Sequence, residues 1–173
     1  MPSGLQYAHC TQAKSGTSGA FGGKYPAAIE DLATREIVGW SMADHLRAGL
    51  CVDALVMALQ RRRPQPGLVH HSDRGSQYAA EPYRQVLGRH GIKQSMSRRG
   101  NCLDNAPMEF FFASLKKEHV HHVRFHSRAE ARAAVFEYVE VFYNRQRLHS
   151  ALGYRTPAEA RAGMEGIDMR AAA

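Results

Sequence analysis

Two carboxylates in this sequence, Asp73 and Glu109, stand in positions from which both could reach one metal ion. Asp73 ends a short apolar run, and Arg74 and Gly75 break that run before a helical pattern begins. Glu109 lies near the start of another helical pattern, within residues 105–112. Such carboxylates can converge on a divalent cation, because magnesium and manganese require hard oxygen ligands. Spacing alone favours a structural interpretation, in which Asp73 caps the following turn and Glu109 meets the helix dipole.

Strand and helix patterns alternate along the chain, and these elements must position the two carboxylates. Strands are indicated by short apolar runs bounded by turn residues, and helices by apolar residues that repeat every three or four positions. This alternation predicts an α/β domain with a mixed sheet. We expect strands at residues 27–29, 36–42, 68–71 and 92–96, and helices at 47–61, at 81–91, around Glu109 and from Ser127 to about Asn144.

The helix that carries Glu109 has the clearest pattern. Lys116 follows Glu109 by about two helical turns, so the acid and the base lie on the same side of the helix. Both residues border an apolar stripe that we expect to be buried. The stripe consists of Met108, Phe111, Phe112 and Leu115.

Three motifs occur in order along the chain: HSDRGSQY, SMSRRGNCLDNAPMEFFFASLKKE and YNRQRLHSALGYRTPAE. Together they resemble the catalytic region of a DDE transposase, in particular the OrfB product of two-frame bacterial insertion sequences, which belongs to the retroviral-integrase superfamily. The resemblance runs from about Ala27 to Ala160, and the gap between Asp73 and Glu109 is the family's own. It implies an RNase H-like fold, the integrase catalytic core, with a mixed sheet flanked by helices.

The resemblance also implies a metal-dependent reaction on DNA. Asp73 and Glu109 match catalytic carboxylates of a polynucleotidyl transferase that cleaves DNA and transfers strands during transposition, with two Mg²⁺ or Mn²⁺ ions. The implied partners are insertion-sequence ends, target DNA, further copies of the chain and a transposase protein from the upstream frame.

The third carboxylate of the family has no clear counterpart in this chain. In the family the first Asp lies on the first strand, ahead of the hairpin that here spans Tyr25 to Met42. No Asp or Glu precedes Glu30. We therefore expect that the first catalytic Asp is lost, through truncation or a frame shift upstream; the alternative is that Asp31 or Glu30 replaces it. Without this ligand, metal binding should be weak and transferase activity near background.

Four further residues are candidates for contact with DNA. Lys116 matches a position that contacts substrate DNA in integrase relatives, although it could also be a solvated lysine. Arg98 and Arg99 lie in a polar segment that we expect to be a mobile loop, where they could hold phosphates without selecting a sequence. Asn105 either shapes the approach to Glu109 or caps its helix.

The third motif matches the C-terminal signature of the family. It either contacts DNA or locks the last helix to the sheet, and the residues do not decide between these roles. The residues concerned are Tyr143, Asn144, Arg145, His149 and Pro157.

Composition divides the chain into three parts. Residues 1–24 are rich in glycine, serine and threonine and show no apolar period, so we expect a poorly structured segment or a badly supported edge strand. Residues 25–160 form the predicted catalytic core. Residues 161–173 are expected to be a flexible tail.

The charge balance favours a polyanionic partner. The 173 residues include 23 Lys and Arg against 16 Asp and Glu, which gives a net charge of +7, and phosphate neutralisation drives sequence-independent binding of nucleic acid. No stretch is long and apolar enough to span a membrane, and we identify no signal peptide. The three cysteines are widely spaced and indicate neither a disulfide framework nor a zinc site. We expect a bacterial cytoplasmic protein associated with the nucleoid.

Three functions fit these observations. The first is a transposase core that cleaves and transfers DNA strands. The second is a catalytically dead DNA-binding or multimerisation remnant of such an enzyme, which the missing Asp favours for this chain in isolation. The third is a stand-alone RNase H-like nuclease.

Overall fold

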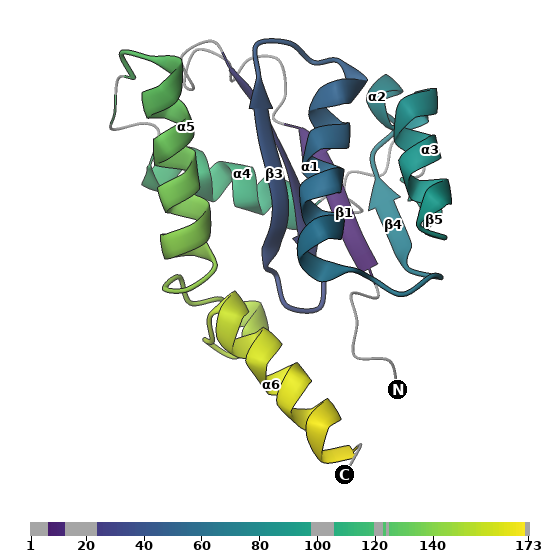
Figure 1. The fold of residues 1–173 in the computed structure, drawn as a ribbon. Coiled ribbons are helices and arrows are strands. Elements are labelled where there is room, and N and C mark those ends of the chain that lie inside the picture. Colours follow the sequence, from purple (N-terminus) through teal and green to yellow (C-terminus); the bar gives the residue numbers. More distant parts are fainter. Residues whose placement is uncertain (1–6, 13–23, 98–105, 120–122, 124, 172–173) are drawn as a thin grey trace.

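The computed structural model describes residues 7–12, 24–97, 106–119, 123 and 125–171. These residues form a five-stranded sheet in the order β3-β2-β1-β4-β5 (Figure 1). β2 pairs antiparallel with both β1 and β3, whereas β1, β4 and β5 are parallel. The strands are β1 (Tyr7–Gln12), β2 (Tyr25–Asp31), β3 (Ile37–Ala43), β4 (Val69–Ser72) and β5 (Lys93–Met96).

Helices cover both faces of the sheet. The core on one face is closed by α1, α2 and α3, and the core on the other face by α4, α5 and the π-helical segment η4. The last helix, α6, extends away from the body of the molecule (Figure 1). The bounds are α1 (Ala48–Arg62), α2 (Ser76–Ala79), α3 (Glu81–Arg89), α4 (Ala106–Glu118), α5 (Arg128–Phe136), η4 (Glu137–Tyr143), the 3-10 turn η5 (Ser150–Leu152) and α6 (Pro157–Ala171).

Residues of β2 alternate between the two cores, as the pleat of a strand requires. Ile29 is buried among the side chains of α1 and α3, whereas Ala28 is buried among those of α4 and η4. The position of any residue paired with β2 can therefore be assigned to one face or the other.

The strands and helices expected from periodicity are confirmed, with bounds that shift by a few residues. The apolar stripe of α4 is buried, since Met108, Phe111 and Leu115 are each no more than 1% exposed. Ser127 caps α5, because its hydroxyl accepts a hydrogen bond from the Glu130 backbone N–H at 3.1 Å.

The first strand corrects the expectation for residues 1–24. Tyr7–Gln12 form β1, which lies at the centre of the sheet and pairs with both β2 and β4. The sequence YAHCTQ has no apolar alternation, so its strand conformation follows from backbone pairing on both sides and not from its own side-chain pattern. Residues 1–6 and 13–23 lie outside the described part of the chain.

The C-terminal residues also differ from the expected flexible tail, because α6 continues to Ala171. Thr156 and Glu159 begin this helix with a capping box. The Glu159 N–H donates to Thr156 Oγ1 at 3.2 Å, and Glu159 Oε2 accepts from the Thr156 N–H at 2.8 Å. Pro157 occupies the first helical position, where its missing N–H has no cost.

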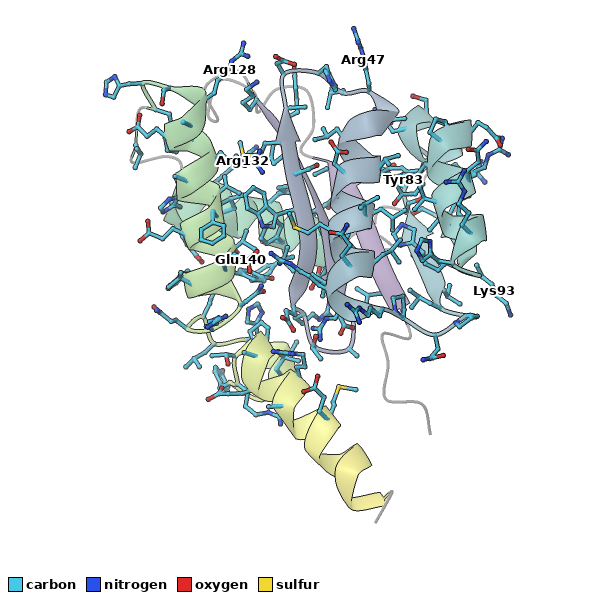
Figure 2. The ribbon with its side chains drawn as sticks, in the orientation of Figure 1. Arg47, Tyr83, Lys93, Arg128, Arg132 and Glu140 are labelled. Carbon is cyan, nitrogen blue, oxygen red and sulfur yellow. The ribbon has the colours of Figure 1, made fainter. Side chains whose placement is uncertain are left out.

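Glu140 links η4 to β3 and to α1, and its side chain lies on the side of η4 that faces the sheet (Figure 2). Its Oε1 accepts a hydrogen bond from Trp40 Nε1 at 3.0 Å and lies 2.7 Å from Arg61 Nη1. Trp40 belongs to β3 and Arg61 to α1, so one carboxylate joins three elements. Within the described residues, no helix is long and apolar enough to cross a membrane.

Gly39 allows β3 and α1 to pack closely, and we expect Gly39→Ala to lower the free energy of unfolding by about 3 kcal/mol. A Cβ at this position would collide with the Ala54 carbonyl oxygen and stand 2.7 Å from the Ala58 nitrogen, and both are backbone atoms of α1. Urea denaturation measures the change. Gly49→Ala is the control, because nothing lies within 4 Å of that site on α1. Equal stability of the two variants would contradict this account of the packing.

Candidate active site

Asp73 directly follows β4 and is half-buried at the carboxyl end of the strand. Its Oδ1 accepts a hydrogen bond from the Gly75 N–H at 2.7 Å, which forms the turn that starts α2. A Cβ at Gly75 would stand 2.9 Å from the same oxygen. A larger residue at position 75 would therefore push the Asp73 carboxylate aside, and the structural role expected for Asp73 as a turn cap is present.

The segment around Asp73 is also tied to the end of β5. Arg74 Nε donates to the Ser97 carbonyl oxygen at 2.9 Å, and the Ser97 N–H donates to the Ser72 carbonyl at 2.9 Å. These bonds continue the pairing of β4 with β5 beyond the strand ends. The backbone that carries Asp73 is thus fixed on both sides.

Glu109 and Lys116 lie on α4 as the sequence predicted. Glu109 is exposed in the first turn, and Lys116 is half-buried near the end of the helix. The buried residues Met108, Phe111 and Leu115 hold α4 against the sheet, where the helix contacts β1. Glu109 is therefore carried by a helix that contacts the strand next to β4.

The register of β1 shows which residue stands beside Asp73. Cys10 pairs with Ser72, so one residue further along these parallel strands Thr11 comes level with Asp73. Thr11 also pairs with Ala28, whose side chain packs in the core closed by α4. Thr11 is thus the position of β1 whose backbone lies next to Asp73 and is paired with Ala28. The whole strand, YAHCTQ, contains no carboxylate.

Asp31 does not converge with Asp73. It pairs with Ala8, so it is two strands away and three residues further back, roughly 14 Å between Cα atoms at standard sheet spacings. Both of its carboxylate oxygens accept hydrogen bonds within its own turn. Oδ1 accepts from the Ala33 N–H at 3.0 Å, and Oδ2 accepts from Thr34 Oγ1 at 2.9 Å.

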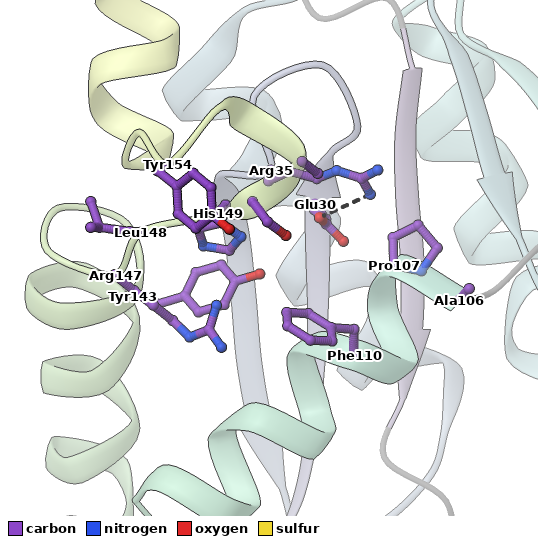
Figure 3. Close-up of a pocket in the computed structure, with 12 residues that line it drawn as sticks. Glu30, Arg35, Ala106, Pro107, Phe110, Tyr143, Arg147, Leu148, His149 and Tyr154 are labelled. Atoms are coloured by element: carbon purple, nitrogen blue, oxygen red, sulfur yellow. Dashed lines mark ion pairs between the residues drawn. The ribbon is translucent and has the colours of Figure 1, made fainter.

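Glu30, the other residue considered as a replacement, lies in a pocket beside the N-terminal end of α4 (Figure 3). Its side chain is 1% exposed, and its Oε1 is 3.6 Å from Arg35 Nη1. Its Oε2 has no hydrogen-bond partner among the described residues. Glu30 pairs with His9, two positions before Thr11 in β1, so Glu30 is not level with Asp73. Its side chain lines the pocket instead.

The pocket has a volume of about 520 Å³ and gathers residues that are far apart in the sequence. Its walls come from β2, from the turn that follows it, from α4, from the end of η4 and from the segment after η4. Sequence reasoning missed this site, although part of the third motif contributes to it. The lining residues are Glu30, Arg35, Ala106, Pro107, Phe110, Tyr143, Arg147, Leu148, His149, Ser150, Ala151 and Tyr154.

Burial shifts the pKa values of two groups in this pocket in opposite directions. It raises the pKa of Glu30 to about 7, although the nearby Arg35 guanidinium opposes the shift. It also lowers the pKa of His149 to about 4, and the positive charges of Arg147 and Arg35 add to that effect. Both groups are therefore shifted toward their neutral forms.

We expect Glu30→Gln to stabilise the protein increasingly as the pH rises from about 4.5 to 7. A carboxyl with a raised pKa in the folded state contributes stability below its unfolded pKa and loses that contribution as the pH passes its folded pKa. The difference in the free energy of unfolding between variant and wild type should grow by up to about 3 kcal/mol and then level off above about pH 7. The opposite contribution of His149 is present in both proteins and cancels.

Chemical denaturation at a series of pH values measures this difference. Glu81→Gln on α3 controls for the loss of one negative charge at the surface. A difference between Glu30→Gln and wild type that stays constant across the series would contradict the assigned protonation of Glu30.

Asn144 locks the end of η4 to the edge of the sheet. Its side-chain amide donates to the Ile37 carbonyl at 3.0 Å, and its carbonyl oxygen accepts from the Ile37 N–H at 2.9 Å. The Asn144 backbone oxygen also accepts from the Ala158 N–H at 2.9 Å, at the start of α6. The structural role considered for the third motif is therefore confirmed at this residue.

Three predicted DNA contacts, Arg98, Arg99 and Asn105, lie outside the described residues. Within the described part of the chain, no group of three or more His, Cys, Asp or Glu side chains could hold a metal ion. The histidines of the first motif have structural partners. His70 Nε2 is 2.7 Å from the hydroxyl of Tyr83, which points from α3 toward the sheet (Figure 2), and His71 Nδ1 is 3.1 Å from Ser95 Oγ.

Two family models, both described as integrase core domain, match residues 12–102 and 90–157. A 31 kDa protein of insertion element IS600 from Shigella sonnei, described as uncharacterized, is 53% identical over 79% of this chain and 50% of its own length. The transposase of IS904 from Lactococcus lactis subsp. lactis is 43% identical over 78% of this chain and 53% of its own. The transposase InsF of IS3A from Escherichia coli K12 is 46% identical over 78% of this chain and 47% of its own length.

The solved structures show the same fold. The catalytic core domain of BIV integrase superposes with a TM-score of 0.67 at 14% sequence identity, covering 96% of this chain and 99% of that one. The predicted RNase H-like fold is thereby confirmed. The chain spans about half the length of the curated relatives that it matches. It belongs to the integrase core domain family, as a relative of the transposases of bacterial insertion sequences.

Proposed function

We propose that this protein is the core of a transposase that acts on DNA, and that Asp73 and Glu109 are ligands of its divalent metal site. The observation that carries the proposal is the arrangement of three adjoining elements. Asp73 follows β4, β4 pairs with β1, and α4, which carries Glu109, contacts β1. The family membership and the transposase relatives support the same conclusion.

The residues present fit Mg²⁺ or Mn²⁺ only in part. Asp73 and Glu109 provide hard oxygen donors, which these ions prefer. The strand beside Asp73 adds no carboxylate. A bound ion would supply Lewis-acid chemistry at a phosphodiester, but two carboxylates are an incomplete set for the two-ion site of the family. We therefore expect weak metal binding.

The protein's own contribution on the DNA side is positive charge. The net charge of +7 favours phosphate contacts, and we propose Lys116, Arg98, Arg99 and Asn105 as the contacting residues. Lys116 lies on the same helix as Glu109, so it would bind phosphate close to the reacting bond. Assembly of several copies on DNA, and with a protein of the upstream frame, is part of the proposal.

A second function is favoured by one specific observation. Because β1 carries no Asp or Glu, the chain could bind DNA without cleaving it, as a catalytically dead form of the family. The two functions share a DNA-binding surface and differ only in whether strands are cut and joined.

Strand transfer from a labelled, pre-cleaved insertion-sequence end in the presence of Mn²⁺ distinguishes them. For the first function, wild type gives weak transfer, Asp73→Asn gives none, and Asp53→Asn, an exposed control on α1, matches wild type. For the second, all three proteins are silent, while DNA binding falls steeply with salt. A wild-type protein that does not bind DNA would contradict both functions.

A further inference from the structure

We propose that the pocket beside Glu109 binds an unpaired nucleotide of the DNA, with the base inside the pocket and the phosphate at its rim. The inference rests on the proposed function, because it requires DNA as the partner. Ala106, Pro107 and Phe110 line the pocket and flank Glu109 on α4. A nucleotide held there would therefore lie next to the candidate active site.

Exposed aromatic rings at the pocket provide flat surfaces for a base. Phe110 is 53% exposed and Tyr154 is 73% exposed, although large apolar side chains are usually buried. Both line the same pocket, from α4 and from the turn after η5 (Figure 3). Stacking on such rings is a common way to bind unpaired bases, because every base has a π-face.

The inner wall of the pocket presents two polar atoms without hydrogen-bond partners among the described residues. These are Glu30 Oε2 and His149 Nε2, on side chains that are 1% and 5% exposed. Buried polar atoms normally have partners, so such a pair calls for a ligand. The edge of a base offers both donors and acceptors. A carboxyl group near its pKa and a neutral imidazole can match either kind.

Arginine side chains border the same space and favour a phosphate. Arg35 lies beside Glu30, and Arg147 lies 5.1 Å from the centre of the Phe110 ring. Arg147 is held in place by Glu118, with Nη2 to Oε1 at 2.9 Å and Nε to Oε2 at 3.1 Å. A guanidinium that is already oriented binds a ligand with less loss of side-chain freedom.

Backbone strain also concentrates at this pocket. Three non-glycine residues in the described part of the chain have positive φ, and two of them, Arg35 (φ 60) and Tyr154 (φ 58), line the pocket. This conformation is unfavourable for side chains with a Cβ and often marks ligand sites. The turn is fixed by hydrogen bonds from the Tyr154 N–H to the His149 carbonyl at 2.9 Å and from the His149 N–H to the Arg155 carbonyl at 3.1 Å.

The size of the pocket favours one nucleotide over other occupants. Its volume of about 520 Å³ lies in the range of small-ligand sites. It can hold a base with its sugar but not a double helix. The arginines would attract a nucleotide and an acidic peptide alike. The aromatic walls and the buried carboxyl of Glu30 favour the nucleotide, because they offer a base a stacking surface and a hydrogen-bonding partner.

Fluorescence anisotropy with three labelled duplexes tests the proposal. One duplex has a short single-stranded overhang, the second has the same overhang without bases, and the third is blunt. We expect wild type to bind the first on the order of tenfold more tightly than the other two. Phe110→Ala and Tyr154→Asn should remove this preference and leave binding of blunt DNA unchanged. Phe136→Ala, a matched control that is 52% exposed on α5, should retain it.

The variants also separate binding from folding. Asparagine tolerates positive φ better than tyrosine, so Tyr154→Asn should not lower the melting temperature. Equal binding of the three duplexes by wild type would overturn the inference and leave the proposed function intact. If Phe110→Ala and Tyr154→Asn keep the preference for the overhang and change only self-association, the inference is likewise overturned and the proposed function stays intact. If the wild-type protein bound none of the three duplexes, both the inference about the pocket and the proposed function would be overturned.

Discussion

Replacement of Thr11 by aspartate is expected to raise strand-transfer activity by about 100-fold, equivalent to ~3 kcal/mol in the barrier. The register of β1 and β4 brings this position level with Asp73, and its partner in β2, Ala28, packs in the core that α4 closes. A carboxylate there would add the ligand that β1 does not supply. The assay is strand transfer from a pre-cleaved end, at fixed Mn²⁺ concentration.

His9→Asp is the matched control for this prediction. His9 lies on the same strand, two residues before Thr11. It pairs with His71 and is therefore not level with Asp73. The same negative charge at this position should give no gain in activity. An equal gain from both substitutions would show that charge in β1, and not a ligand beside Asp73, is responsible.

A large effect on stability is also expected for Asn144→Ala, which should lower the free energy of unfolding by about 3 kcal/mol. Asn144 is 4% exposed and satisfies both backbone groups of Ile37 at the edge strand β3. Its removal leaves a buried N–H and a buried carbonyl without partners. Each such group costs about 1–3 kcal/mol, much more than the loss of an exposed hydrogen bond.

Denaturant unfolding measures this change, with Gln146→Ala as the control. Gln146 is exposed and lies two residues along the chain, so its substitution should stay within about 0.5 kcal/mol of wild type. If Asn144→Ala also stays within that range, water must reach Ile37, and the proposed attachment of η4 to the sheet would be wrong.

Elements with strong local signals could be predicted from the sequence. The stripe of Met108, Phe111 and Leu115 fixed both the helix and its buried side, because apolar periodicity reports directly on burial. The capping box of Ser127 and Glu130 marked the start of α5 in the same way. Asp73 and Glu109 became candidate metal ligands through their motifs, since their spacing alone favours structural roles, and their role as ligands stays a prediction.

Features that depend on pairing between distant segments could not be predicted. β1 has no apolar alternation, and its central place follows from backbone hydrogen bonds to β2 and β4. The pocket joins Glu30 and Arg35 to Phe110 and Tyr154, which are brought together only by the packing of α4 and the turn after η5. The one signal of this pocket in the third motif is Tyr154, a large aromatic residue directly after a glycine.

The central claim is that Asp73 and Glu109 are ligands of a metal site to which the first strand contributes no carboxylate ligand. A Mn²⁺ titration of wild type, Asp73→Asn and Thr11→Asp, followed by electron paramagnetic resonance, tests it most directly. We predict weak binding by wild type, still weaker binding by Asp73→Asn, and at least about tenfold tighter binding by Thr11→Asp. Equal affinity of wild type and Asp73→Asn, or no gain from Thr11→Asp, would contradict the claim.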